Sequence, residues 1–445
     1  MRVLLAPDRF SGTLTAVAAA RALGRGWREA AGTDVVTEVP MSDGAGGLLD
    51  VVAAARGGTL VPVTVPGPLG TPVPAAVLHV PGHGGGTAYV EAGQVLGAHL
   101  VPAADRGRAA TAGTSTGLGE LMLAALRTGA GRVVVGLGPG AVHDAGAGLL
   151  AALSRAATDP AGERRGAPLE RGGPLERGGL ALADLRADGA VLAAARDALG
   201  AADIVLALAD DAPLLGLHGA GAILGQDPGV GPATAQELER ALGHATTQLE
   251  RAAARLAPRR PRLTLADDDV ARPGSPAAGH SSGSFGAGHS HGVSAAPARM
   301  ARRSGTGAGG GAAFLLRLLG ARATAGAELV ADAVDLAGHV DRADLVVTGG
   351  RVLDATALTE SVPATVGRLA MARGLPVVAV AEEVHTSRRE VAQIGISGTY
   401  EVVEPRRAGT TRAAGDAAAS GRPAAAAPAE LLAARGARIA RTWSA

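Results

Sequence analysis

Five aspartates in this chain stand just beyond short apolar runs, where an acidic side chain could hold a divalent cation or orient a hydroxyl group. They are Asp8, Asp43, Asp144, Asp211 and Asp354. Carboxylate oxygens are ligands that Mg²⁺ prefers, and open α/β sheets bind ligands beyond the carboxyl ends of their strands. Each aspartate taken singly is more readily interpreted as a solvated turn residue or a helix N-cap. If most of them share one cleft, the sequence predicts a cation site, with Asp8 and Asp144 as the first candidates for metal or hydroxyl chemistry.

Two glycine-rich segments could hold anionic oxygens through backbone N–H groups at helix N-termini. The glycines are Gly136, Gly138 and Gly140 in the first segment and Gly305, Gly307, Gly309 and Gly310 in the second. Such short glycine patterns are equally consistent with tight-turn packing. The alternatives of anion binding and packing therefore stay open for both segments.

The permanent cations of this chain are all arginines, because the sequence contains no lysine. A lysine-dependent phosphate loop or Schiff base is therefore excluded. Arg9 and Arg351 could clamp a carboxylate or phosphate with two parallel hydrogen bonds, although a surface role fits each one alone. His143 beside Asp144 is read as structural.

Composition excludes several further classes of function. The absence of cysteine rules out disulfides, thiolate metal sites and cysteine nucleophiles. A formal net charge of +1 creates no overall field that favours nucleic acid or an anionic membrane. No uninterrupted apolar run is long enough to span a membrane, and the N-terminus lacks a signal-peptide pattern. The expectation is a cytoplasmic protein with neither a nucleic-acid nor a membrane partner, and its oligomeric state is left open.

The elements that must position these residues alternate between strands and helices. Residues 3–6 form a predicted strand, which is followed by a helix reaching about residue 31. A second predicted strand over residues 35–39 is followed by a helix over 48–55. This order favours a parallel, doubly wound α/β sheet. Residues 59–90 are rich in valine, proline and glycine, which indicates a second, partly antiparallel unit. Later apolar runs at 132–137, 204–209, 345–348 and 376–380 predict further strands.

Eight segments, in this order, resemble the motifs of the bacterial glycerate kinase family. They are residues 6–26, 40–50, 67–73, 114–121, 136–148, 210–229, 305–311 and 343–358. The resemblance implies a two-domain α/β fold in which a second, swivelling α/β domain is inserted into a flavodoxin/Rossmann-like parallel-sheet domain. The expected boundaries are 1–65 and 301–404 for the first domain and 66–262 for the insert. Residues 263–300 are expected to form a low-complexity linker whose role is left open, and residues 405–445 a disordered tail.

The resemblance also implies an activity, the phosphorylation of D-glycerate by ATP with Mg²⁺, commonly to 2-phosphoglycerate. Asp8 and Asp144 are then the candidate catalytic residues and Mg²⁺ ligands. The implied substrate- or phosphate-binding residues are Arg9, Asp43, Thr114, Ser115, Gly136, Gly138, Gly140, Asp211, Gly307, Gly309, Arg351 and Asp354.

The chain departs from the family pattern mainly in its loops. The opening motif reads Asp8-Arg9-Phe10-Ser11-Gly12, where the family usually has Asp-Ser-Phe-Lys-Gly. The next loop has Gly46 where the family has a glutamate, and Pro139 removes a backbone donor from the central loop. Loss of one preorganised donor typically costs about 10²–10³ in rate. The alternative prediction is therefore a catalytically impaired pseudokinase that binds small molecules or regulates.

Overall fold

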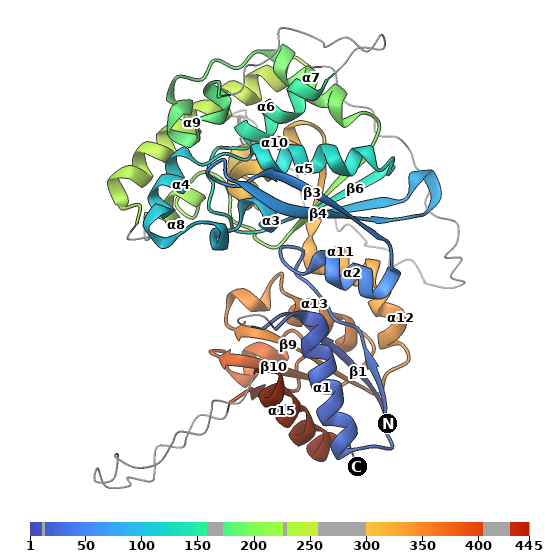
Figure 1. Cartoon of the computed structure of the whole chain (residues 1–445). Coiled ribbons are helices and arrows are strands. Elements are labelled where there is room, and N and C mark those ends of the chain that lie inside the picture. Colours follow the sequence, from blue (N-terminus) through green and yellow to red (C-terminus); the bar gives the residue numbers. More distant parts are fainter. Residues whose placement is uncertain (11–13, 158–171, 226–228, 257–299, 404–427, 445) are drawn as a thin grey trace, which may run out of the picture.

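Two sheets, each with its own helices, form the two lobes of the molecule (Figure 1). The computed structural model describes residues 1–10, 14–157, 172–225, 229–256, 300–403 and 428–444. Within that part of the chain, none of the helices combines the length and the apolar character needed to cross a lipid bilayer.

The first lobe is built on a five-stranded parallel sheet with the order β11-β10-β9-β1-β2. Its strands are β1 (Arg2–Pro7), β2 (Val35–Glu38), β9 (Leu345–Leu353), β10 (Val377–Val384) and β11 (Gly398–Glu401). If the five strands are renumbered 1 to 5 in chain order, their order in the sheet is the flavodoxin-like 2-1-3-4-5. The chain adds strands toward one edge of the sheet up to β2 and toward the other edge from β9 onward, so the switch point lies between β1 and β9. The central strands contain buried apolar runs at residues 3–6, 345–347 and 377–381, as expected for a parallel sheet buried on both faces.

Alternate residues of the central strands pack against different helices. Val3 and Leu5 face α1 (Ala16–Ala30) and α15 (Pro428–Trp443), whereas Leu4 and Ala6 face a cluster that includes α13 (Val362–Met371). The Thr15 hydroxyl caps α1 by accepting from the Ala18 N–H. Two shorter helices complete this lobe, α12 (Leu336–Val340) and α14 (Arg388–Ala392).

The second lobe is built on a six-stranded mixed sheet with the order β3-β4-β5-β6-β7-β8. Its strands are β3 (Thr59–Pro66), β4 (Pro72–Val80), β5 (Thr87–Glu91), β6 (Arg132–Leu137), β7 (Asp203–Leu208) and β8 (Arg322–Ala325). The pairs β3–β4 and β4–β5 are antiparallel and the remaining pairs are parallel. The prediction of a partly antiparallel unit in residues 59–90 is therefore confirmed.

One face of the second sheet is covered by helices that share its core. They are α5 (Thr116–Arg127), α6 (Ala147–Ala156), α7 (Gly189–Leu199), α9 (Pro232–Ala253) and α10 (Ala312–Leu318). Shorter helices in this lobe are α3 (Gly93–Leu96), α4 (Arg106–Ala112) and α8 (Ala220–Leu224). Short 3₁₀-helices lie at His83–Gly85, Ala98–Leu100, Ala103–Asp105, Pro174–Glu176, Gly179–Asp184, Met300–Arg302, Ala308–Gly311 and Thr356–Leu358.

Two helices lie between the lobes, α2 (Leu48–Arg56) and α11 (Gly326–Ala333) (Figure 1). Leu48 and Val330 belong to one apolar cluster with Val134 of the second sheet and Val346 of the first. Because this cluster is continuous, the lobes share a core where α2 and α11 meet them. The loops at the ends of these helices are therefore positioned by both sheets.

The sheet assignments differ from the predicted domain boundaries. Residues 59–65 pair with β4, and β8 pairs with β7, so both segments belong to the second sheet and not to the first. Phe314 is likewise buried in the second lobe's core. The predicted boundaries followed changes in composition along the chain, whereas strand pairing decides which sheet a segment joins.

The C-terminal segment also differs from its prediction. Residues 428–443 form α15, which buries Leu432 and Ile439 against Leu23 and Trp27. An Ala/Arg-rich stretch of this kind reads as disordered when no partner surface is known, and α1 supplies that surface here. Residues 405–427 of the predicted tail and 263–299 of the predicted linker lie outside the described residues.

Candidate active site

A cleft of about 700 Å³ opens between the lobes, at the carboxyl ends of β1 and β9. This is the point where the strand order of the first sheet reverses, and open α/β sheets bind ligands there. Its acidic lining residues are Asp8, Asp43, Asp210, Asp211, Asp354 and Glu360. The structure therefore brings four of the five predicted aspartates into one cleft, and Asp144 is not among its lining residues.

Asp8 sits at the switch point itself, directly after β1. Its N–H donates to the Gly349 carbonyl of β9 at 2.8 Å, and its Oδ1 accepts from the Arg9 N–H at 2.7 Å. Burial and the nearby Asp43 carboxylate raise the pKa of Asp8 well above its usual value, against the opposing effect of Arg9. A cation placed beside Asp8 and Asp43 would offset both effects and favour the ionised form of Asp8.

Asp43 lies in a tight loop that precedes α2. Its Oδ1 accepts from the Ala45 N–H at 2.8 Å. The neighbouring Ser42 hydroxyl accepts from the Gly44 N–H and donates to the Gly46 carbonyl, both at 3.0 Å. These local bonds occupy one carboxylate oxygen and give the loop a defined shape, which is what a metal-binding or positioning residue needs.

The two predicted arginines both line the cleft. Arg351 projects from the end of β9, and Arg9 follows Asp8. The Arg9 guanidinium lies over Gly46, since an added Cβ at Gly46 would be 2.1 Å from Arg9 Nη1. Both arginine side chains are exposed at the cleft, so either can reach a bound anion.

Further acids contribute negative charge to the same cleft. Asp354 accepts hydrogen bonds from the Thr356 hydroxyl and backbone N–H groups, which lower its pKa. Partial burial and nearby carboxylates, Asp211 first among them, raise the pKa of Glu360. Asp210 and Glu360 were not predicted as site residues. The strand-end pattern that selected Asp211 applied equally to Asp210, whereas Glu360 reaches the cleft only because the lobes meet there.

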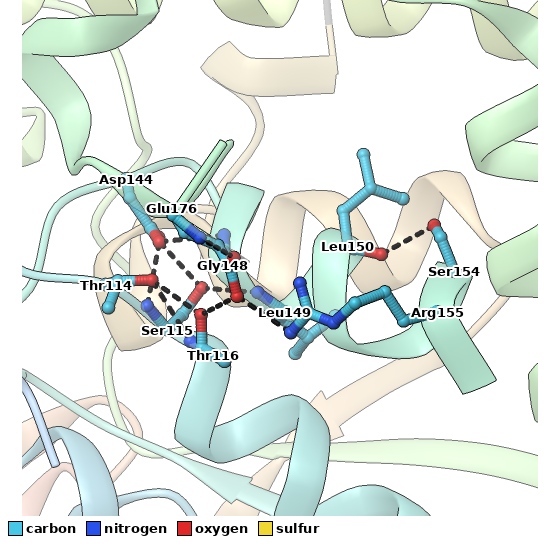
Figure 2. Close-up of polar contacts among 11 residues, drawn as sticks. Thr114, Ser115, Thr116, Asp144, Gly148, Leu149, Leu150, Ser154, Arg155 and Glu176 are labelled. Atoms are coloured by element: carbon cyan, nitrogen blue, oxygen red, sulfur yellow. Dashed lines mark hydrogen bonds and ion pairs between the residues drawn. The ribbon is translucent and has the colours of Figure 1, made fainter. Parts of the chain in front are cut away.

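Asp144 belongs to a different, fully buried cluster, shown in Figure 2. Its Oδ2 accepts from the Ser115 N–H and hydroxyl, both at 2.8 Å, and from the Gly148 N–H at 3.0 Å. Its Oδ1 accepts from the Gly146 N–H at 3.0 Å. Burial raises the pKa of Asp144, and these donors oppose the shift. The carboxylate thus joins the N-terminal ends of α5 and α6 and does not face the cleft beside Asp8.

Thr114 and Ser115 lie in this same buried cluster. The Ser115 hydroxyl accepts from the Leu149 N–H at 2.9 Å, and the Thr114 and Thr116 hydroxyls share a hydrogen bond of 2.8 Å. Figure 2 also shows Thr116 reaching Glu176, which pairs with Arg155 at 2.7 Å. Among the described residues, Thr114 and Ser115 do not line the interlobe cleft.

The predicted glycines are tightly packed against other parts of the protein. An added Cβ at Gly136 would meet the Gly44 carbonyl oxygen at 1.9 Å, and one at Gly138 would meet the Ala45 Cβ at 2.5 Å. A Cβ added at Gly140 would lie 3.1 Å from the Leu96 carbonyl oxygen. A Cβ added at Gly307 would lie 2.9 Å from the Ala212 carbonyl oxygen, and one added at Gly309 would lie 2.9 Å from Leu137 Cδ2. The geometry favours the packing alternative over a phosphate cradle.

Comparison with known proteins gives consistent matches. Residues 3–443 match the model of the glycerate kinase family. The glycerate 2-kinase of Escherichia coli is 30% identical over 403 residues, which cover 91% of this chain and 91% of that protein. The glycerate kinase of Bacillus subtilis is 29% identical over 404 residues, covering 91% and 90%.

A solved structure matches the fold. The crystal structure of putative glycerate kinase 2 from Salmonella typhimurium superposes with a TM-score of 0.67 at 24% identity, covering 99% of this chain and 98% of that one. This likeness, together with the parallel sheets, confirms the predicted α/β fold class.

Proposed function

Since the chain belongs to the glycerate kinase family, we propose that it transfers the terminal phosphoryl group of ATP to a hydroxyl of D-glycerate, giving phosphoglycerate. The observation that carries this proposal is the interlobe cleft, where Asp8 and Asp43 lie together at the sheet's switch point beside Arg9 and Arg351. Phosphoryl transfer needs little beyond positioning and charge compensation, which acids, arginines and a metal ion provide. An ATP donor implies a cytoplasmic reaction.

The donor set of the cleft fits Mg²⁺ delivered with the nucleotide. Among the described residues, no group of three or more acidic or histidine side chains is arranged to hold a metal ion by itself. Mg²⁺ in phosphotransfer sites is commonly held by one or two carboxylates together with substrate phosphates. Asp8 and Asp43 would supply these oxygens, and the ion would offset the charge of the transferred phosphoryl group.

The arginines and the remaining acids have separate roles in this proposal. Arg9 and Arg351 hold the glycerate carboxylate and the phosphates with charge-assisted hydrogen bonds. Asp211 and Asp354 line the same cleft and add negative charge to it. The other predicted residues act by holding the surrounding loops, and they are Thr114, Ser115, Asp144, Gly136, Gly138, Gly140, Gly307 and Gly309.

The direct test measures ADP formation with D-glycerate and ATP, with and without Mg²⁺. Turnover that needs both glycerate and Mg²⁺ is expected, and Asp43→Asn should lower kcat about 10²-fold or more. Asp50→Asn, which changes an exposed acid of α2, is the matched control. Wild-type protein without glycerate-dependent turnover would contradict the proposal.

One observation favours the alternative of a binding protein without turnover. The Asp43 loop packs against Gly136 through the Gly44 carbonyl and against Gly138 through the Ala45 Cβ, so packing accounts for both glycines without a bound phosphate. This alternative expects ATP or glycerate to raise the midpoint of thermal unfolding while no ADP forms. Stabilisation accompanied by turnover would instead support the kinase.

A further inference from the structure

The loop that carries Asp43 follows β2 of the first sheet, but its backbone is seated against the second lobe. Three glycines form what we call the glycine socket, and they are Gly136 and Gly138 of that lobe and Gly326 at the start of α11 between the lobes. A Cβ added at Gly136 would lie 1.9 Å from the backbone carbonyl oxygen of Gly44. A Cβ added at Gly326 would lie 1.9 Å from the backbone carbonyl oxygen of Asp43. At Gly136 and Gly326 only glycine allows this approach, because a side chain there would overlap the loop backbone. An added Cβ at Gly138 would lie 2.5 Å from the Cβ of Ala45 in the same loop.

The first helix after this loop lacks a cap of its own. The N-cap residue of α2 is Gly47, which has no side chain to accept from the N–H groups of the first turn. Glu91, at the end of β5, supplies the missing acceptor. Its Oε1 accepts from the Leu48 N–H at 3.2 Å. The neighbouring N–H groups of Gly47 and Leu49 also favour the ionised carboxylate and oppose the rise in the pKa of Glu91 that burial causes. A negative group at a helix N-terminus is further favoured by the helix dipole.

Glu91 lies at the end of β5, which pairs with β6, the strand that contains Gly136. The Ala92 N–H donates to the Gly136 carbonyl at 2.9 Å, which fixes the end of β5 beside Gly136. On the other side, the Met41 N–H donates to the Pro7 carbonyl at 2.9 Å, next to Asp8. The Asp43 loop is therefore held to Asp8 at its start and to the second lobe at its end.

We propose that Glu91 is a positioning residue, whose carboxylate caps α2 and so, with the glycine socket, holds Asp43 in its place beside Asp8. Without the carboxylate, the first N–H groups of α2 lose their partner in a half-buried setting, and the loop before them can shift. A displacement of about 1 Å in a reacting group can cost about 10² in rate. The kinetic consequence rests on the proposed function, whereas the effect on the loop does not.

The test compares Glu91→Gln and Glu91→Ala with Asp50→Asn, an exposed acid in the first turn of the same helix. All three changes remove one negative charge from this helix end, but only the first two alter the cap. Hydrogen–deuterium exchange at residues 43–49 is expected to be about tenfold faster in both Glu91 variants and unchanged in Asp50→Asn. Segments of the second lobe away from Glu91 should exchange at the wild-type rate.

Kinetics supply the second readout. Both Glu91 variants should lower kcat about tenfold or more and raise the Mg²⁺ concentration for half-maximal rate, while KM for glycerate stays within about twofold. Glu91→Gln keeps one acceptor oxygen and should be affected less than Glu91→Ala.

Two results would overturn the inference. Wild-type exchange at residues 43–49 in Glu91→Ala would show that the cap does not hold the loop. Faster exchange with kcat unchanged in an active enzyme would show that the loop does not need to be held. Absence of turnover in the wild type would instead count against the proposed function, and the exchange measurement would still decide the role of Glu91.

Discussion

Asp8 and Asp144 follow strands of different lobes, and only Asp8 lies at the interlobe cleft. Asp8 lines the interlobe cleft beside Asp43, whereas Asp144 is fully buried and accepts four hydrogen bonds from Ser115, Gly146 and Gly148. Two residues that look alike in the sequence therefore have different relations to activity and to stability.

The first prediction separates these two aspartates by substitution to asparagine. Asp8→Asn should abolish nearly all turnover and leave the protein about as stable as the wild type, because the amide oxygen can still accept from the Arg9 N–H and the charge that is removed is disfavoured in the fold. Asp144→Asn places an NH₂ group among buried donors and should lower the free energy of unfolding by about 2–4 kcal/mol. Denaturant unfolding and kcat per folded molecule measure both effects. A stable but inactive Asp144→Asn protein would show that Asp144 takes part in catalysis.

The second prediction concerns Gly136, whose added Cβ would lie 1.9 Å from the Gly44 oxygen. Gly136→Ala must displace the Asp43 loop or β6, which should lower stability by about 1–3 kcal/mol and reduce kcat more than KM. Gly243→Ala in α9 is the control, because among the described residues outside the helix the nearest atom to its Cβ would be Leu215 Cδ1 at 4.0 Å. That change should be neutral or stabilise by about 0.5–1 kcal/mol. Equal behaviour of the two variants would contradict the packing described for Gly136.

The third prediction is a pH dependence of stability that originates at His143. Burial lowers the pKa of His143 from 6.5 to about 4. The folded state therefore favours the neutral ring. The contribution of the neutral His143 ring to the free energy of unfolding is complete above pH 6.5. It is lost as the pH falls toward 4, because the unfolded state gains the proton first. At pH 5 the loss should be about 2 kcal/mol.

His143→Leu should remove this dependence, and the variant also eliminates the buried Nδ1, which has no hydrogen-bond partner in the part of the chain that the structure describes. Urea unfolding of both proteins at pH 7 and pH 5 measures the difference. His385→Gln, at a largely exposed histidine, is the control and should keep the wild-type dependence. The same pH dependence in His143→Leu as in the wild type would assign it to other groups.

The fourth prediction concerns the packing of α15 on α1. An added Cβ at Gly26 would lie 1.8 Å from the Ala433 carbonyl oxygen, so Gly26→Ala should force the two helices apart. Trp443, whose Nε1 donates to the Tyr400 hydroxyl at 3.1 Å, should become more exposed to water. We expect a red shift of tryptophan emission and a lower thermal midpoint. Gly32→Ala, beyond the end of α1, is the control, because its nearest neighbour would be the Arg28 oxygen at 3.4 Å. An unchanged spectrum in Gly26→Ala would contradict this helix contact.

Part of the site followed from local sequence alone. The apolar runs that became β1, β7 and β9 placed Asp8, Asp211 and Asp354 at strand ends, and parallel strands direct their carboxyl ends to one edge of a sheet. Asp43 joined them because β2 is also parallel to β1. Strand direction therefore predicts that Asp8 and Asp354 lie at one edge of the first sheet. Asp211 follows β7 of the second sheet and reaches the same cleft because the two lobes meet there.

Other features depended on which surfaces meet in three dimensions. Asp144 also follows a strand, but the buried donors around it include Ser115, which is 29 residues away in the sequence. The partners of Gly136 and of Glu91 lie on the loop and helix between the lobes, and α15 is ordered against α1. Composition and spacing therefore determined the strands and the acids at their ends, because these follow from local burial and direction. Only the tertiary structure decided which polar groups face the cleft and which serve as internal caps, because that choice depends on the partners supplied by distant segments.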